Sequence, residues 1–305
     1  MNKNRLCVNI AGLRLDNPTM LASGVLGLSA ELMSVAVTGG AGAVVSKSIG
    51  PEPRNGFANP TVVQTDYGLI NAIGLPNPGI DHFAEEIPLV SKLGVPVIVS
   101  VYGFSVDDYV VVTKKAVEGG ADAVELNVSC PHVKCTGSEI GQDPMLLEEI
   151  VKAVKNGIDR PVFVKLSPNV TNIIEIAEVA ADAGADALTA INTLRATAID
   201  IETTRPILSN RIGGLSGPAI KPVAIRCVYE IYEKVRVPII GCGGLVYWKD
   251  AVEFLLAGAR AVQIGTALMI QDGNVFKTVT EGVEAYLRRK GFKNVKDIVG
   301  LAHKK

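Results

Sequence analysis

The chain has 305 residues, of which 48% are hydrophobic and 20% are charged, and its net charge at pH 7 is −1. This composition is typical of a globular protein, and it lacks the basic field that would hold nucleic acid or an anionic membrane. The first residues, MNKNRLCVNI, contain no apolar signal-peptide segment, and no apolar run is long enough to cross a bilayer. We therefore expect a cytoplasmic protein.

The five cysteines and three histidines form no recognisable disulfide framework or metal site. The cysteines are scattered and odd in number, which argues against paired disulfides. Cys130 and Cys135 are close in sequence, but they do not form a CxxC pair. Because iron–sulfur clusters require clustered thiolates, we expect this chain to bind neither a cluster nor another metal.

In chain order, the first predicted element is a hairpin at residues 7–18, CVNIAGLRLDNP. Its polar and apolar residues alternate and Ala11-Gly12 indicates a turn, so two short strands are expected at the floor of the fold. Eight short apolar segments follow, each typical of a parallel strand buried on both faces. They are TMLASG (19–24), GGAGAVVSKS (39–48), GVPVIVSVYG (94–103), GGADAVELNVS (119–129), RPVFVKLSP (160–168), AGADALTAIN (183–192), VPIIGCGG (237–244) and AGARAVQIGT (257–266).

The spacing of these segments predicts their connections. Four contain equivalent glycines, Gly40, Gly120, Gly184 and Gly258, which are 80, 64 and 74 residues apart. A βα unit takes roughly 30 to 40 residues, so each gap holds two units. We therefore expect eight alternating strands and helices.

This pattern predicts an α/β fold, a (β/α)8 TIM barrel with an N-terminal β-hairpin, in a single domain over residues 1–305. Residues 173–184 and 250–259 have the helical spacing expected of the connecting segments. A Rossmann sheet is the alternative, but no strand is followed by the G-x-G-x-x-G fingerprint that binds a dinucleotide.

In such barrels, the carboxyl ends of the strands form the functional face. The expected strands end there in polar or small residues: Ser23, Lys47, Ser48, Ser100, Asn127, Ser129, Cys130, Lys165, Asn192, Thr193, Gly243, Gly244, Gly265 and Thr266. Any one of them could merely satisfy a backbone group or reach solvent. Polar groups gathered from six strands are costly without a ligand, so the set predicts a binding site.

Two strand ends indicate the class of ligand. Gly243-Gly244 and Gly265-Thr266 follow the seventh and eighth strands, where this fold commonly binds phosphate through exposed backbone N–H groups. Two tight turns would have the same sequence. A phosphate there, with a ring across the barrel mouth, suggests FMN at the C-terminal face of the strands. Lys165 would then stabilise the charge that builds on the reduced ring.

Two loops complete the predicted site. NAIGLPNPG, residues 71–79, is rich in turn formers, and long loops at this face are usually functional, although an ordered surface turn is the alternative. Cys130 opens a second loop, PHVKCTGSEIGQ. A partly ionised thiol can accept a proton, so we predict that Cys130 is a general base for an acidic C–H group. A redox disulfide with Cys135 is the less favoured interpretation.

Several motifs of the chain occur together in one known family. They are ASGVLG (22–27), SKS (46–48), NAIGLPNPG (71–79), LNVSCP (126–131), VKLSPN (164–169), INT (191–193), GGLSGPAIKP (213–222), GCGG (241–244) and IGTAL (264–268). From about Leu6 to Leu301, the sequence resembles the class 1 dihydroorotate dehydrogenases, and class 1B most closely. The combination of SCP and NAIGL is highly specific.

The resemblance implies an enzyme that binds one noncovalent FMN and oxidises dihydroorotate to orotate in de novo pyrimidine (UMP) biosynthesis. Cys130 would take the C5 proton while a hydride passes from C6 to flavin N5. The implied flavin contacts are Ser23, Lys47, Ser48, Ser100, Asn127, Lys165, Ile191, Gly217, Gly243, Gly244, Gly265 and Thr266. The implied substrate contacts are Lys47, Asn71, Ala72, Ile73, Gly74, Leu75, Asn127, His132, Asn192 and Thr193.

The resemblance also implies a partner. Class 1B enzymes pass electrons to NAD through a second subunit with FAD and an iron–sulfur cluster, and their homodimers pair with two copies of it in a heterotetramer. This chain has neither a dinucleotide fingerprint nor cluster cysteines, so both cofactors are expected on the partner. Class 1A enzymes, which use fumarate directly, would look similar. Class 2 enzymes are disfavoured because they have serine in place of Cys130 and an N-terminal membrane extension.

Two residues depart from the family pattern. His132 stands where asparagine usually binds substrate, and Ser100 stands where class 1B usually has asparagine near the flavin. CPH followed by GQDP (141–144) also resembles the related domain of dihydropyrimidine dehydrogenase, which is the alternative enzyme, although NAIGLPNPG and INT argue against it. The alternative that is not an enzyme is a flavin-free barrel that serves as a binding scaffold.

The assignment of Cys130 predicts the effect of replacing it. Cys130→Ser should slow reduction of bound flavin by dihydroorotate by roughly 100- to 10,000-fold, because a general base contributes that much to a rate. Flavin binding should be unchanged. Anaerobic stopped-flow absorbance measures the rate, and Cys135→Ser is the matched control with a normal rate. Unchanged reduction in Cys130→Ser would remove Cys130 as the base.

Overall fold

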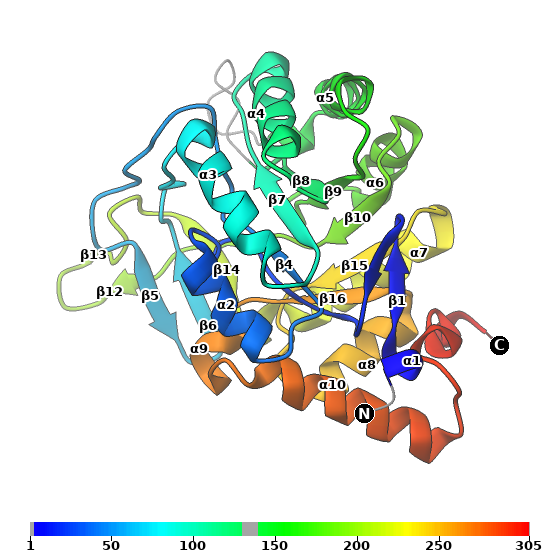
Figure 1. Cartoon of the computed structure of the whole chain (residues 1–305). Coiled ribbons are helices and arrows are strands. Elements are labelled where there is room, and N and C mark those ends of the chain that lie inside the picture. Colours follow the sequence, from blue (N-terminus) through cyan, green and yellow to red (C-terminus); the bar gives the residue numbers. More distant parts are fainter. Residues whose placement is uncertain (1–2, 130–139, 305) are drawn as a thin grey trace.

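A computed structural model describes residues 3–129 and 140–304 (Figure 1). Its centre is a closed barrel of parallel strands, and all eight predicted strands are present. They are β3 (Thr19–Leu21), β4 (Ala43–Val45), β7 (Val97–Val101), β8 (Ala123–Asn127), β9 (Val162–Leu166), β10 (Ala187–Ala190), β15 (Ile239–Cys242) and β16 (Ala261–Ile264). Strands pair in chain order, and β16 pairs with β3 to close the barrel.

Helices surround the barrel, as expected of the (β/α)8 fold. The main ones are α2 (Ala30–Thr38), α3 (Ile80–Ser91), α4 (Val106–Glu118), α5 (Pro144–Gly157), α6 (Ile173–Asp182), α7 (Lys221–Lys234), α8 (Trp248–Ala257) and α10 (Val275–Lys290). Shorter ones are α1 (Lys3–Leu6), α9 (Ala267–Gln271) and the 3-10 turns η1 (Ile140–Gln142), η2 (Pro218–Ile220), η3 (Val295–Ile298) and η4 (Leu301–His303). In the described ranges, no helix combines the length and apolarity that crossing a membrane requires.

The core lies between the strands and the inner faces of the helices. Every residue of β7 and β9 is buried, as it should be in strands covered on both faces. Helix α6 buries Ile173, Ile176, Ala177 and Ala180, which recur every three to four residues and so share one face. Asn172 caps its first turn by accepting a hydrogen bond from the backbone N–H of Ile174 at 3.2 Å.

The predicted N-terminal hairpin is confirmed. Strands β1 (Val8–Ile10) and β2 (Leu13–Leu15) pair in antiparallel fashion around the Ala11-Gly12 turn. Val8, Ile10 and Leu15 are buried in the main core. The hairpin lies at the amino-terminal end of the barrel, because Val8 lines the same surface groove as Arg260, which directly precedes β16.

A small antiparallel sheet, here called the roof, was not predicted. It consists of β11 (Leu194–Ala196), β14 (Gly213–Ser216), β6 (Gly68–Asn71) and β5 (Val62–Thr65), in that order. Two more short strands, β12 (Ile199–Asp200) and β13 (Arg205–Pro206), pair with each other. In Figure 1 they lie at the left, near β5 of the roof and far from β1. The expected long loop after the second barrel strand therefore contains a hairpin, and residues 72–79 follow it.

Asp250 fixes the turn between β15 and α8. Its Oδ2 atom accepts hydrogen bonds from the backbone N–H groups of Val246 (3.0 Å) and Tyr247 (2.8 Å). Its Oδ1 atom accepts one from Lys221 Nζ at 2.8 Å. Burial alone would raise the pKa of Asp250, but Lys221 and the two N–H groups lower it overall. The carboxylate therefore holds the segment that carries Gly243-Gly244.

Loss of this carboxylate should destabilise the fold. Asp250→Ala should lower the free energy of unfolding by about 2 to 3 kcal/mol, because it leaves two backbone donors and a lysine unpaired. Urea unfolding followed by circular dichroism measures the change. Glu253→Ala is the matched control, since exposed Glu253 binds the same Lys221 at 2.8 Å, and it should cost about 0 to 1 kcal/mol. Equal losses in the two variants would contradict this role for Asp250.

Candidate active site

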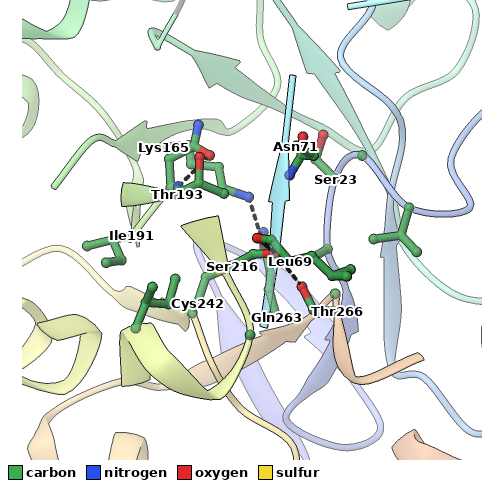
Figure 2. Close-up of a pocket in the computed structure, with 18 of the residues that line it drawn as sticks. Ser23, Leu69, Asn71, Lys165, Ile191, Thr193, Ser216, Cys242, Gln263 and Thr266 are labelled. Carbon is green, nitrogen blue, oxygen red and sulfur yellow. Dashed lines mark hydrogen bonds between the residues drawn. The ribbon is translucent and has the colours of Figure 1, made fainter. Parts of the chain in front are cut away.

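A cavity of about 450 Å³ lies at the carboxyl ends of the barrel strands, within the size range of small-molecule sites. Barrel strands supply its floor, and Leu69, Asn71 and Ser216 of the roof line it as well (Figure 2). Polar side chains from distant segments meet there: Ser216 Oγ accepts a hydrogen bond from Thr266 Oγ1 at 2.8 Å. The geometry thus brings strand ends and roof around one enclosed space.

The structure gathers most of the predicted site residues in this cavity. Those that line it are Ser23, Lys47, Ser48, Asn71, Ile73, Leu75, Asn127, Lys165, Ile191, Asn192, Thr193, Gly217, Gly243, Gly244, Gly265 and Thr266. Ser100, Ala72 and Gly74 do not line it. Cys130, Cys135 and His132 lie outside the described residues.

Ser100 lies behind the wall rather than in it. Its side chain is fully buried, and its Oγ lies 2.9 Å from Ser48 Oγ in a hydrogen bond. Ser48 also accepts a hydrogen bond from Asn127 Nδ2 at 2.9 Å. In this structure Ser100 thus lies behind Ser48, which itself lines the cavity, and the flavin contact expected of Ser100 stays a prediction.

Ala72 and Gly74 also depart from the expected contacts. The backbone N–H of Ala72 donates to Thr61 O at 2.8 Å, and Gly74 O accepts a hydrogen bond from Arg54 Nε at 2.8 Å. These bonds hold the 72–79 segment so that its neighbours Ile73 and Leu75 reach the cavity. Gly74 has a φ of +82°, and a Cβ there would lie 2.6 Å from the Phe57 nitrogen, so glycine is required.

A group of amide and hydroxyl side chains occupies one part of the wall. Asn192 Nδ2 donates to Ser129 Oγ at 2.8 Å, and Asn127 Oδ1 accepts from the backbone N–H of Ser129 at 3.2 Å. On the roof, Asn71 Nδ2 donates to Gly214 O at 3.3 Å. These bonds fix the amides in place, so their remaining donors and acceptors are oriented before a ligand binds.

Lys47 supplies positive charge beside these amides. Burial lowers the pKa of Lys47, and its ammonium forms no ion pair or hydrogen bond with any residue that the structure describes. A partly buried cation without a carboxylate is costly. An anionic ligand in the cavity would offset that cost, which makes Lys47 the clearest indication of a negatively charged substrate.

Backbone N–H groups are available at another part of the wall. Gly244, Leu245, Gly265 and Thr266 all line the cavity, and within residues 3–129 and 140–304 their N–H groups have no hydrogen-bond acceptor. Gly244 has a φ of +74°, and a Cβ there would lie 2.6 Å from the Lys221 nitrogen. Gly244 and Gly265 have no side chains to cover these amides, which suits a phosphate.

Lys165 crosses the cavity floor. Its Nζ donates to Gln263 Oε1 at 3.1 Å and lies 3.8 Å from Glu125 Oε1; Figure 2 shows Lys165 and Gln263 together with Cys242. Burial lowers the pKa of Lys165, but Cys242 and Glu125 raise it more, and the net direction is upward. The raised pKa favours the charged form of this buried lysine at the cavity floor.

The family of the chain follows from its sequence over nearly the whole length. The family profile of dihydroorotate dehydrogenases matches residues 5–287. The chain belongs to the dihydroorotate dehydrogenase family. Dihydroorotate dehydrogenases are flavin-dependent oxidoreductases, and the free amides and enclosed cavity of this chain fit a phosphate-bearing ring system.

Its relatives are of the B type, as the sequence motifs predicted. The chain is 51% identical over 304 residues to "Dihydroorotate dehydrogenase B (NAD(+)), catalytic subunit" of Pyrococcus horikoshii, covering 100% of both chains. The protein of the same name from Pyrococcus abyssi is 52% identical over 297 residues, 97% of this chain and 99% of its own. That of Methanothermobacter thermautotrophicus is also 52% identical over 297 residues, covering 97% of each.

Sequence reasoning missed several wall residues. The main ones are Leu69, Ser216 and Gln263, while Cys242 was expected at the end of the seventh strand but was given no role. Leu69 and Ser216 belong to roof strands that have no strong apolar pattern. Gln263 lies inside the apolar strand AVQI, and a lone polar residue inside a buried strand is the signal that could have revealed it.

The free amides predict a charge-dependent effect at Gly265. A Cβ there meets only Ala22 Cβ at 3.4 Å and Val25 Cγ2 at 3.6 Å, so a side chain should be compatible with folding. Gly265→Asp should weaken FMN binding at least about tenfold more than the isosteric Gly265→Asn, because two anions about 4 Å apart repel strongly at low dielectric. Fluorescence titration with FMN measures this. Equal affinities in the two variants would move the phosphate elsewhere.

Proposed function

We propose that this chain oxidises dihydroorotate to orotate in de novo pyrimidine biosynthesis, with one noncovalent FMN as its cofactor. The observation that carries this proposal is that one cavity contains two separate groups without protein partners in the part of the chain that the structure describes. One is the Lys47 ammonium, which has no carboxylate partner there, and the other is a set of unbonded backbone amides around Gly244 and Gly265. Two anionic groups can therefore be bound at once. The names of the relatives, together with family membership, support the choice of substrate.

The residues that would hold FMN are those at the ends of β15, β16, β3 and β4. The amides of Gly243, Gly244, Gly265 and Thr266 would bind the phosphate, while Gly217 leaves room beside it. Ser23, Lys47, Ser48, Asn127, Lys165 and Ile191 would contact the rest of the cofactor. When bound, FMN supplies an acceptor for a hydride.

The asparagine side chains of the cavity wall would hold the substrate. Orotate and dihydroorotate are small rings with one carboxylate and several amide-type edges. Lys47 would neutralise the carboxylate, and Asn71, Asn127, Asn192 and Thr193 would pair with the polar edges. Ile73 and Leu75 would pack against the ring, and His132 remains a predicted ligand. Because the asparagines are already hydrogen-bonded to their neighbours, binding costs little ordering.

Cys130 is the proposed general base. It directly follows Ser129, whose backbone N–H donates to Asn127 and whose hydroxyl accepts from Asn192. These two bonds fix the end of the segment that leads to Cys130. Its sulfur would accept the C5 proton of dihydroorotate, leaving the C6 hydrogen to depart as hydride. Lys165 would stabilise the negative charge that then develops in the cavity.

We also propose a partner. The relatives are catalytic subunits of NAD(+)-linked enzymes by name, so this chain would act as a cytoplasmic homodimer, with each copy a single domain. A second subunit with FAD and an iron–sulfur cluster would carry electrons to NAD, giving a heterotetramer. The names of the relatives favour NAD as the electron acceptor over the fumarate that class 1A enzymes use. The free amides favour FMN over a flavin-free scaffold.

The direct test is a visible spectrum of the purified chain, repeated without oxygen after dihydroorotate is added. We expect a flavin spectrum that bleaches, with no reduction of NAD until the partner subunit is supplied. A yellow protein that ignores dihydroorotate but responds to dihydropyrimidines would favour the dihydropyrimidine dehydrogenase alternative. A protein that stays colourless with added FMN would overturn the proposal.

The isolated charge of Lys47 predicts how orotate affinity depends on pH. Burial lowers the pKa of Lys47 from 10.5, so its charge is lost at lower pH than in an ordinary lysine. Orotate affinity should therefore fall as pH rises through this pKa. Lys47→Met should weaken orotate binding by roughly 10- to 100-fold and abolish this pH dependence in calorimetric titrations. Exposed Lys152→Met is the control and should match the original protein. Equal orotate affinities for Lys47→Met and the original protein would place the carboxylate elsewhere.

A further inference from the structure

Glu125 is a charged residue that the proposed function does not use. It belongs to β8, and its side chain is fully buried inside the barrel. We propose that Glu125 is a positioning residue, which keeps the Lys165 ammonium charged and directs it toward the cavity. The value of this to catalysis rests on the proposed function, but the effect on Lys165 does not.

The Glu125 carboxylate is held from two other strands. Its Oε2 atom accepts hydrogen bonds from Thr189 Oγ1 of β10 at 2.8 Å and from Gln263 Nε2 of β16 at 2.6 Å. The side chain therefore spans the barrel interior and cannot turn away without breaking two buried bonds. Within the described ranges its Oε1 atom has no hydrogen-bond partner, and the nearby cation is Lys165 Nζ at 3.8 Å.

Gln263 connects the two charges. Its Nε2 donates to the Glu125 carboxylate while its Oε1 accepts from Lys165 Nζ at 3.1 Å. A carboxylate requires a donor and an ammonium requires an acceptor, so the amide has one favourable orientation. The ammonium is thus aligned by Gln263 and charge-balanced by Glu125.

A purely structural role accounts poorly for this cluster. Interiors of TIM barrels are filled mainly by branched apolar side chains, and replacing a buried ion pair with apolar residues is often neutral or stabilising. Here Glu125, Thr189, Gln263 and Lys165 instead form a polar layer, and two of them, Lys165 and Gln263, line the cavity. The polar layer lies where its charge can act on a ligand.

The groups that face Lys165 leave Glu125 as its counter-ion. They are Glu125 from β8, Thr189 from β10, Cys242 from β15 and Gln263 from β16, with Lys47 in the same cavity wall. Burial raises the pKa of Cys242, against the influence of Lys165, so Glu125 is the carboxylate among the described groups that face this ammonium. Lys47 has no such carboxylate among the described residues, and burial lowers its pKa, whereas the pKa of Lys165 is raised.

The experiment measures the Lys165 ammonium directly in the full chain. Protein labelled with ε-13C lysine is titrated by NMR, and the Lys165 signal is assigned with Lys165→Met. In Glu125→Gln, which keeps the size of the side chain, the titration midpoint should fall by about 1 to 3 pKa units. Glu148→Gln, at the exposed pair with Lys152, is the matched control and should leave it unchanged. An unshifted midpoint in folded Glu125→Gln would overturn the proposal.

Two further measurements test the proposal even if Glu125→Gln does not fold. In the original protein, Lys165 should titrate above 10.5 and Lys47 below it, and the reverse order would overturn the proposal. Glu125→Asp retains the charge, so it should keep the Lys165 midpoint within about 1 unit of the original. A midpoint that falls further in Glu125→Asp would show that side-chain length, not charge, sets the pKa, and would also overturn the proposal.

The flavin provides a separate measurement. If FMN is bound, its midpoint potential in Glu125→Gln should drop relative to the Glu148→Gln control at pH values above the new Lys165 midpoint, because the cation near it is lost. An equal potential in both would overturn the positioning role. A chain without flavin would defeat the proposed function, while the lysine titration would still decide the effect of Glu125 on Lys165.

Discussion

Closure of the barrel is the constraint on which the site depends. The pairing of β16 with β3, supported by the bond from Val262 N to Pro18 O at 2.8 Å, joins the two ends of the fold. It leaves no barrel strand with an open edge. It also brings Gly265 next to Ala22, although more than two hundred residues separate them. Without closure, the free amides after β16 and the serines after β3 and β4 would not share a cavity.

Within that cavity, different parts of the chain suit different chemical groups of a ligand. Backbone amides at glycines suit a ligand group that must approach closely, and they come from the turns after β15 and β16, the first of which is held by Asp250. Fixed asparagines suit a planar ring with several polar edges. The two lysines differ in kind: Lys47 has no carboxylate partner among residues 3–129 and 140–304, so it can bind an exchangeable anion, whereas Lys165 lies 3.8 Å from the buried Glu125 carboxylate. A substrate that binds and leaves would suit a cation such as Lys47, and a cofactor that stays bound would suit one such as Lys165.

The barrel was predictable because its strands are continuous apolar runs and their Gly-Ala starts repeat at a regular spacing. The cavity wall was largely predictable because strand ends in this fold face one way, which brought Lys47, Asn127, Lys165 and Asn192 together. The roof was not, since its strands are short and half-buried and pair across about 140 residues, as Asn71 does with Gly214. The burial of Ser100 behind Ser48 was not predictable, because the sequence does not show whether a residue near a strand end faces the cavity or is covered by its neighbour.

The roof has a consequence for how specificity can change. It is built from two excursions, one between β4 and α3 and the other between β10 and α7, and their strands pair with each other through β6 and β14. Asn71 belongs to the first excursion and Thr193 to the second, while the free amides belong to neither. A designer who wished to redirect the barrel to another ring would therefore need to transplant both excursions as a matched set. The phosphate-binding turns could be left untouched.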